Sequence, residues 1–180
     1  VGKTCSSILI AENFINIFDK KILVLLPSSL ESNYRKELFD ITKLNYENRT
    51  YDACSGQRFL NNLPDWYKLS RHEVNKRVQN MIKDDYSFFG YLKIVNVVEK
   101  IKTNALKKYP SNQELREQYE FWMIREKFSN RVIVIDEIHN IRISNDKSMK
   151  KFPKVLKKII KFSENIRLIL LSATPMFDKP

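Results

Sequence analysis

Three continuous apolar runs, each ending in polar residues, limit what this chain can fold into. The runs are KKILVLLP (20–27), RVIVIDEIHN (131–140) and NIRLILLSATP (165–175). Uninterrupted hydrophobic runs of this kind are typical of parallel strands that are buried on both faces. Because they alternate with helical patterns, they predict an α/β fold, a parallel sheet flanked by helices, with its functional site at the carboxyl ends of the strands.

The segments between these runs carry helical patterns. Apolar residues recur at Ile8, Ala11, Ile15 and Phe18, which predicts a helix close to the first residues. Further helices are expected at about 30–40 and at 153–163, with Pro153 in a first helical turn.

Residues 55–128 differ in composition, being rich in Tyr, Phe, Asn and Lys and without an apolar strand run. We interpret them as a largely helical insertion within one partial domain that spans residues 1–180. Its helices are expected near 70–83, 92–108 and 112–128.

The first residues, VGKT, resemble the second half of a phosphate-binding loop, G-x-x-x-x-G-K-[ST]. Only Gly2, Lys3 and Thr4 can be compared with that signature. The tripeptide occurs by chance in many chains, so on its own it is equally compatible with an ordinary solvated helix start. A helix beginning here would direct its first backbone amides towards an anion.

The tetrapeptide DEIH at 136–139 follows a predicted buried strand. A carboxylate there is costly unless it meets a cation, and Mg²⁺ held between phosphates, Thr4 and Asp136 would supply one. Glu137 could then orient and deprotonate the attacking water. The alternative is a strand that simply ends in acidic residues. We favour the catalytic interpretation because GKT precedes DEIH in the required strand order, and this context also gives weight to His139, which alone would be typical of a surface histidine.

The third strand ends in SATP at 172–175. Its small hydroxyl residues could bond the acidic and histidine side chains of the DEIH strand. Alone, these residues are more typical of a Ser/Thr/Pro turn.

In this order, GKT, DEIH and SATP resemble motifs I, II and III of the superfamily 2 DExH helicases and translocases, and the match covers their first RecA-like domain. PSSLESNYRKEL (27–38) resembles motif Ia of that family. The phrases VGKTCSSILIAE, ACSGQRFL, YSFFGYLKI and SATPMFDKP are similar to the helicase-like NTPases of large nucleocytoplasmic DNA viruses, the group that contains poxvirus early transcription factor and transcription-termination NTPases.

The resemblance implies ATP and Mg²⁺ as cofactors and a role for each matching residue. These roles are phosphate binding by Gly2 and Lys3, Mg²⁺ binding by Thr4 and Asp136, catalysis by Glu137 with Lys3 and His139, coupling of nucleotide state to nucleic acid by His139, Ser172 and Thr174, and nucleic-acid contact by Pro27, Ser28 and Ser29.

The resemblance also implies a function, the ATP-binding half of an ATP-dependent helicase or translocase in viral transcription. Its partners would be the phosphate backbone of DNA or RNA, a second RecA-like domain in the same full-length chain, and a viral RNA polymerase. It would be intracellular, in the virion or the host cytoplasm. The half loop and the absence of the later motifs predict a fragment that is inactive alone.

The formal net charge of +11 favours an anionic partner, although a lysine-rich genome would give the same excess. In KSMKKFPKVLKKIIKF (147–162) we expect a solvated lysine face and a buried apolar face. The lysine face holds Lys154, Lys157, Lys158 and Lys161, and the apolar face holds Leu156, Ile159 and Ile160. The aromatic residues expected in the core rather than stacked on bases are Phe88, Phe89, Tyr91, Phe121 and Trp122.

Cys5 and Cys54 lack the spacing of a zinc site and occur without secretory features, which favours a reduced intracellular compartment. No apolar run reaches about 18 residues, so no membrane span is expected.

Two other functions stay open. One is a non-catalytic scaffold subunit of a transcription complex, which GKT and DEIH disfavour. The other is a P-loop ATPase acting on a partner other than nucleic acid, which SATP and the motif Ia resemblance disfavour.

Overall fold

The computed structural model describes residues 2–18, 20–139 and 149–172. Within them, four parallel strands form one sheet in the order β4-β1-β5-β6. The strands are β1 (Ile22–Leu25), β4 (Tyr86–Phe89), β5 (Arg131–Ile135) and β6 (Ile166–Leu170). The α/β fold expected from the apolar runs is therefore confirmed, and those runs are β1, β5 and β6.

Helices and a small second sheet surround these strands. The α-helices are α1 (Lys3–Glu12), α2 (Glu31–Leu38), α3 (Gln57–Asn61), α4 (Arg71–Asp85), α5 (Tyr91–Lys108), α6 (Gln113–Phe128) and α8 (Phe152–Phe162). Short 3₁₀ turns are η1 (Ser28–Leu30), η2 (Ile41–Lys43), η3 (Trp66–Lys68) and η4 (Met149–Lys151), and β2 (Leu44–Asn45) pairs antiparallel with β3 (Thr50–Tyr51).

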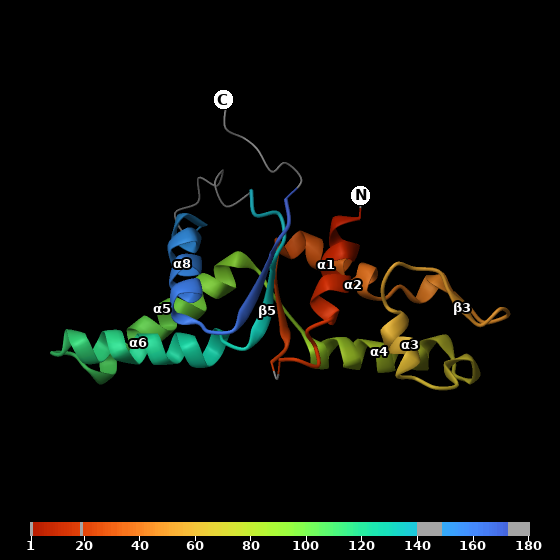
Figure 1. Ribbon diagram of the computed structural model, residues 1–180, viewed down its shortest axis with the longest axis horizontal. Helices are drawn as coiled ribbons and strands as arrows, with labels where there is room; N and C mark the ends of the chain where they lie inside the picture. The colour runs from red at the N-terminus through yellow and green to blue at the C-terminus, as the bar shows by residue number, and fades with distance from the viewer. Residues whose placement is uncertain (1, 19, 140–148, 173–180) are drawn as a thin grey trace, which may run out of the picture.

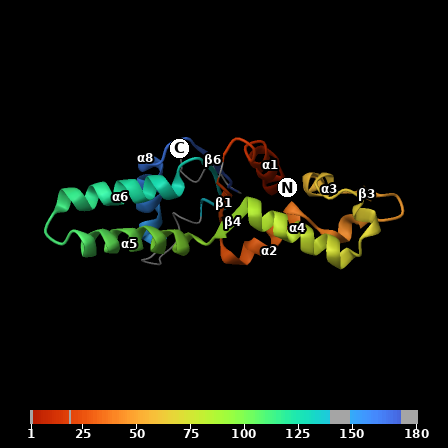
Figure 2. The ribbon, with the colours of Figure 1, turned by 90° about the horizontal axis from the view of Figure 1, so that it is seen from below.

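The sheet is covered by helices on both faces (Figure 1). Along β1, Ile22 and Val24 enter one hydrophobic cluster, whereas Leu23 and Leu25 enter the other. The first cluster is closed by α1, α2, α3 and α4 and the second by α5, α6 and α8, an arrangement that the perpendicular view also shows (Figure 2). Because successive side chains point to opposite faces, burial on both faces requires an unbroken apolar run.

The helices α2, α4, α5, α6 and α8 confirm the helical stretches expected from the sequence. The first helix is shorter than expected, because α1 ends at Glu12 and leaves Ile15 and Phe18 in the non-helical segment that follows. The sequence interpretation identified no strand within 55–128, yet Tyr86–Phe89 forms β4. YSFF is a short aromatic stretch interrupted by Ser87 rather than a continuous aliphatic run, so the criterion that identified the other strands does not select it, and it forms a strand by pairing with β1.

Burial on both faces is confirmed for β1 and β5 but is wrong for β6. Within the described residues β6 lies at the edge of the sheet, and Leu168 and Leu170 are 37% and 50% exposed.

The apolar face expected for α8 is correct at Ile159, which is buried, and at Leu156, which packs against the core, but wrong at Ile160. Phe152, Val155 and Ile159 are its buried residues, and Ile160 is 43% exposed because one further residue rotates it about 100° away from that stripe. Among the aromatic residues expected in the core, Tyr91 is buried, with 5% of its surface exposed. The expectation is wrong for Trp122, which is 62% exposed on α6. In the described part of the chain no helix is long and apolar enough to span a membrane.

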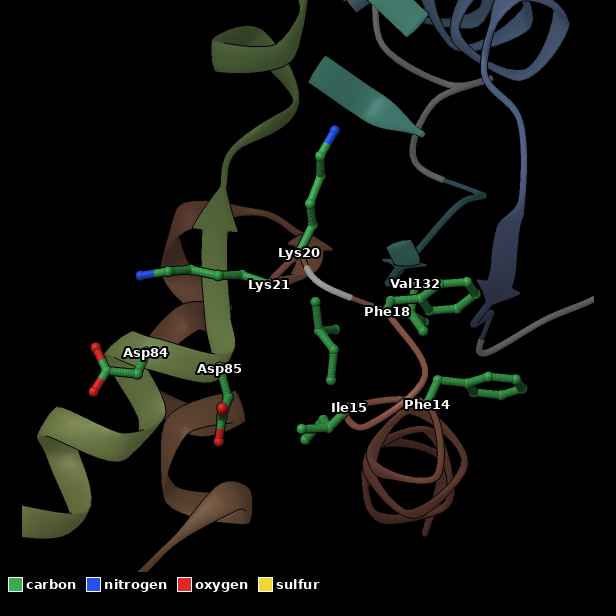
Figure 3. A pocket seen from close by; sticks show the side chains of 9 residues that line it. Phe14, Ile15, Phe18, Lys20, Lys21, Asp84, Asp85 and Val132 are labelled. Carbon is green, nitrogen blue, oxygen red and sulfur yellow. The ribbon is translucent and has the colours of Figure 1, made fainter. Parts of the chain in front are cut away.

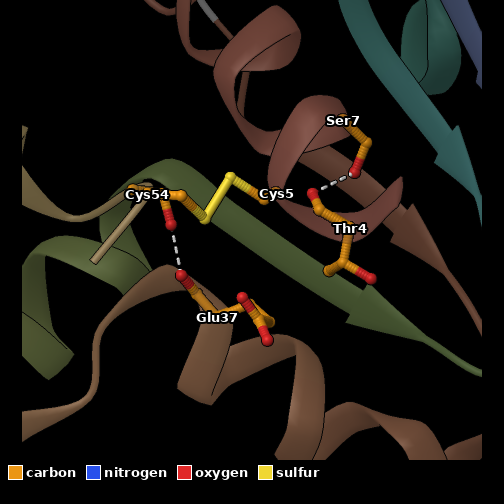
Figure 4. Close-up of a disulfide and its surroundings, with 6 residues drawn as sticks. Thr4, Cys5, Ser7, Glu37 and Cys54 are labelled. Carbon is orange, nitrogen blue, oxygen red and sulfur yellow. Dashed lines mark hydrogen bonds between the residues drawn. A yellow bond between two sulfur atoms is a disulfide. The ribbon is translucent and has the colours of Figure 1, made fainter. Parts of the chain in front are cut away.

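A disulfide joins Cys5, in the first turn of α1, to Cys54, in the loop before α3 (Figure 4). The Cα atoms are 6.2 Å apart, within the usual range for a disulfide. The loop is also tied to α2, because the Ser55 hydroxyl donates to the main-chain oxygen of Glu37. The cysteine spacing does not predict this pairing, since 49 residues separate the two positions and only the fold brings them together.

Reduction of the Cys5–Cys54 disulfide should lower the free energy of unfolding by about 2–4 kcal/mol, because a cross-link across a loop of this length restricts the unfolded chain. Denaturant titrations with and without a reducing agent measure the difference. The Cys54→Ser variant should match the reduced protein and should not respond to the reductant. Equal stability of the unmodified protein in both conditions would contradict this prediction.

Candidate functional site

The carboxyl ends of all four strands lie at one level. In the strand register, Leu25 pairs with both Phe89 and Ile135, and Ile135 pairs with Leu170. The residues that follow these positions therefore emerge at the same edge of the sheet, as expected for a parallel sheet. They include the segments beginning at Leu26, Gly90, Asp136 and Leu171.

The helix α1 begins beside this edge. Gly2 precedes it with a φ of 91°, a left-handed conformation that favours glycine, and its carbonyl oxygen accepts from Ser6 N at 2.9 Å. Lys3 and Thr4 form the first turn, and the Thr4 carbonyl oxygen accepts from the Ser7 hydroxyl at 2.7 Å (Figure 4). The free backbone amides of this turn, together with the Lys3 ammonium, suit an anion.

The DEIH turn is fixed by backbone bonds to both neighbouring strands. Asp136 N donates to Leu25 O at 2.9 Å, and Leu171 N donates to Ile135 O at 2.8 Å. Ile138 N then donates to Leu171 O at 3.0 Å. The turn therefore keeps its place although its residues have left the strand.

Asp136 is a buried carboxylate, only 7% exposed. Its Oδ1 accepts from Glu137 N at 2.9 Å. Burial raises the pKa of Asp136, an effect only partly offset by that hydrogen bond and by the charges of Lys3 and His139. A divalent cation would favour the ionised form, so the residue fits the role of a Mg²⁺ ligand.

Glu137 lies at the centre of a chain of contacts between the three motifs. Its Oε1 lies 3.5 Å from Lys3 Nζ, and its Oε2 lies 3.1 Å from His139 Nδ1. His139 Nδ1 is also 3.3 Å from the Ser172 hydroxyl. The structure thus brings together four predicted site residues from three segments of the sequence. Lys3 belongs to GKT, Glu137 and His139 to DEIH, and Ser172 to SATP.

Other predicted residues lie elsewhere at the same edge. Pro27 to Ser29 follow β1, and η1 begins at Ser28. The Ser28 hydroxyl lies beside Gly90, where an added Cβ would be only 3.3 Å from it. Thr174 lies outside the described residues.

Tyr91 also contacts this site, although the sequence interpretation assigned it only to the core. Its hydroxyl donates to the main-chain oxygen of Asp136. Burial raises the pKa of Tyr91 above its usual value, so the hydroxyl stays protonated and able to donate. The signal that could have identified Tyr91 is the pairing of β4 with β1, because this pairing places the end of β4, and Tyr91 just after it, at the same edge of the sheet.

A separate pocket of about 200 Å³ lies at the opposite, amino-terminal edge of the sheet (Figure 3). It is lined by Phe14, Ile15, Phe18, Lys20, Lys21, Ile22, Asp84, Asp85 and Val132. None of the predicted site residues is among them, so this pocket is distinct from the motif cluster.

Comparison with known proteins identifies a family. Residues 1–177 match the family model described as "Type III restriction enzyme, res subunit". The chain is 30% identical over 179 residues to one "Putative ATP-dependent RNA helicase" of Acanthamoeba polyphaga mimivirus and 26% identical over 189 residues to another. It is 25% identical over 191 residues to a "Putative helicase" of Invertebrate iridescent virus 3. No solved structure was found to match.

These alignments cover 98–99% of this chain but only 26%, 15% and 16% of the three relatives. The chain therefore spans about a quarter of the length of the first relative and less of the other two.

Replacing Asp136 with Asn should stabilise the fold in the absence of metal. Asn keeps an oxygen that can accept from Glu137 N and removes a buried charge. Because the folded-state pKa of Asp136 is raised, the ionised carboxylate destabilises the fold at neutral pH, and this penalty fades as the pH falls through that pKa. Thermal unfolding in EDTA should show a Tm gain on the order of 2–4 °C at pH 7, the scale of a change of about 1 kcal/mol.

The gain should disappear at acidic pH, where Asp136 is protonated. A variant that is less stable than the unmodified protein at pH 7 would show that burial of this carboxylate carries no net penalty.

Proposed function

Because the chain belongs to the family described as type III restriction enzyme, res subunit, and is a superfamily 2 helicase ATP-binding domain, we propose that it is the N-terminal ATP-binding half of an ATP-dependent helicase or translocase. ATP is the substrate of the hydrolysis, and DNA or RNA is the polymer on which the protein acts. A second RecA-like domain of the same full-length chain completes the catalytic site.

One observation carries this proposal, the line of contacts from Lys3 through Glu137 and His139 to Ser172. It joins residues of motifs I, II and III, and Lys3 of motif I stands more than a hundred positions before Glu137 in the sequence. A scaffold protein has no need for a lysine, a buried carboxylate and a second carboxylate at this one edge.

The geometry supports a specific division of labour. The amides of the first turn of α1 and the Lys3 ammonium bind the β and γ phosphates. Thr4 and Asp136 would hold Mg²⁺, which would neutralise negative charge on the phosphates. A phosphate that binds Lys3 also competes with Glu137 for the same ammonium, since the two side chains are 3.5 Å apart without it. Nucleotide binding thereby changes the electrostatic surroundings of Glu137.

Glu137 orients a water and accepts its proton as the water oxygen attacks the γ-phosphorus, and ADP leaves with the electrons of the broken bond. His139 contacts both Glu137 and Ser172, so it senses the charge state of the catalytic carboxylate and transmits it to the strand end at Ser172. Thr174 belongs to this coupling segment by its place in SATP.

Pro27, Ser28 and Ser29 contact the nucleic-acid backbone at the end of β1. We assign the biological step to viral transcription, with a viral RNA polymerase as a partner, on two grounds. The relatives named above are proteins of large DNA viruses, and phrases along the chain resemble the helicase-like NTPases of that group of viruses, which contains the poxvirus transcription NTPases.

Replacing Glu137 with Gln should slow ATP turnover of the full-length protein by about 10²-fold or more, because a positioned general base is lost. Nucleotide affinity should change little, since Lys3 and the α1 amides are retained. Steady-state ATPase assays and equilibrium binding of an ATP analogue measure the two effects. Glu164→Gln, which alters an exposed carboxylate away from the motif cluster, serves as the control. Unchanged turnover in Glu137→Gln would remove this residue from the catalytic role.

Replacing Ser28 and Ser29 with Glu should abolish stimulation of the ATPase by a single-stranded oligonucleotide, because a new negative charge would repel the phosphate backbone. Replacing the exposed Lys154, Lys157 and Lys161 with Gln should leave stimulation intact. Stimulation is measured against salt concentration and should fall steeply in the unmodified protein as phosphate contacts exchange with counterions. Loss of stimulation in the lysine variant, with retention in the serine variant, would place the nucleic acid on α8 instead.

A further inference from the structure

The backbone of Glu137 adopts a conformation that needs external support. Its φ is 53°, in the left-handed region that residues other than glycine and asparagine rarely enter. Such a conformation persists only where the surroundings fix it, and it is often found at functional sites. What holds Glu137 in this conformation also decides where its carboxylate points.

The peptide group between Asp136 and Glu137 is held at both of its polar ends. Its N–H, on Glu137, donates to the Asp136 Oδ1 at 2.9 Å. Its carbonyl oxygen, on Asp136, accepts from the Tyr91 hydroxyl. Rotation of this peptide plane would change the φ of Glu137, so the two hydrogen bonds together set the direction of the catalytic side chain.

Tyr91 is itself held firmly. It is the first residue of α5, it is 5% exposed, and its ring lies 5.0 Å from that of the fully buried Phe152. The hydroxyl is therefore a fixed donor on a helix that belongs to the opposite helical layer from α1. The other hydrogen bond of this peptide group is made within the turn, where the Asp136 carboxylate accepts from Glu137 N. That carboxylate is also the group proposed to bind Mg²⁺.

We propose that Tyr91 is a positioning residue for ATP hydrolysis, which holds the Asp136–Glu137 peptide plane so that the Glu137 carboxylate faces the attacking water. In this role it acts through the backbone of Glu137, by its hydrogen bond to the Asp136 carbonyl oxygen. The inference rests on the proposed function of Glu137 as the general base and adds a residue that the motifs do not contain.

Tyr91→Phe in the full-length protein tests this role. The ring and its contact with Phe152 remain and only the hydroxyl is lost. The kcat for ATP should fall about tenfold, because displacement of a catalytic group by a fraction of an ångström is costly. Equilibrium affinity for a non-hydrolysable ATP analogue should stay within about twofold, since the phosphate-binding groups do not touch Tyr91.

Tyr86→Phe is the matched control. Tyr86 is 3% exposed and starts the strand that ends just before Gly90, but its hydroxyl lies 3.4 Å from Glu12 at the other end of the sheet. The same substitution there should affect stability without a selective loss of kcat. Equal effects of Tyr86→Phe and Tyr91→Phe on kcat would overturn the proposal.

A double-mutant cycle with Glu137→Gln separates positioning from general destabilisation. If Tyr91 acts through Glu137, Tyr91→Phe should have almost no further effect on kcat once Glu137 is Gln. A further loss by the same factor would show that Tyr91 does not act through Glu137. A normal kcat in Glu137→Gln alone would instead refute the proposed function, so the two failures are distinguishable.

Hydrogen exchange of the Glu137 amide gives a readout that does not depend on activity. Tyr91→Phe should accelerate exchange in the peptide that contains residues 136–139, whereas Tyr86→Phe should not. Unchanged exchange at that peptide in Tyr91→Phe would also count against the proposal.

Discussion

Burial of β1 and β5 on both faces is the constraint on which the rest of the structure depends. Every residue of β1 is buried, and along β5 the same holds from Val132 to Ile135. Two helical layers are needed to cover such a sheet, and α5, α6 and α8 form one of them while α1 to α4 form the other. The strand register that follows brings the ends of β4, β1, β5 and β6 to one edge, where polar residues can leave the core.

Charged side chains lie at that edge, where Asp136 and Glu137 follow β5, because they could not be buried within the sheet without a large free-energy cost. Asp136 is still buried, and the cost of its ionisation appears as a raised pKa. Glu137 adopts a left-handed backbone one residue later. Both features destabilise the fold. The backbone of the turn is kept in place by its hydrogen bonds with Leu25, Leu171 and Tyr91. A site of this kind is expected where strain and buried charge serve chemistry rather than folding.

Patterns within a short window predicted most of the fold, and contacts between distant segments account for what was missed. The apolar runs identified β1, β5 and β6, and helical periodicity located α2, α4, α5, α6 and α8. The strand β4 was missed because YSFF owes its structure to pairing with β1 rather than to its own pattern. Motif order led to Lys3, Glu137, His139 and Ser172, which the fold brings together. Tyr91 and the bond between Cys5 and Cys54 could not be predicted, since each depends on a partner 45 or more residues away.

The missed strand also links the proposed nucleic-acid segment to the proposed catalytic carboxylate. Leu26 N donates to Phe89 O at 3.2 Å, so the chain leaving β1 is bonded to the chain leaving β4. The Ser28 hydroxyl then lies against Gly90, where even a methyl group would meet it at 3.3 Å. Tyr91 follows Gly90 and bonds the Asp136 carbonyl oxygen. The segment that follows β1 and the peptide group before Glu137 are thus joined by contacts through the end of β4, which none of the sequence motifs includes.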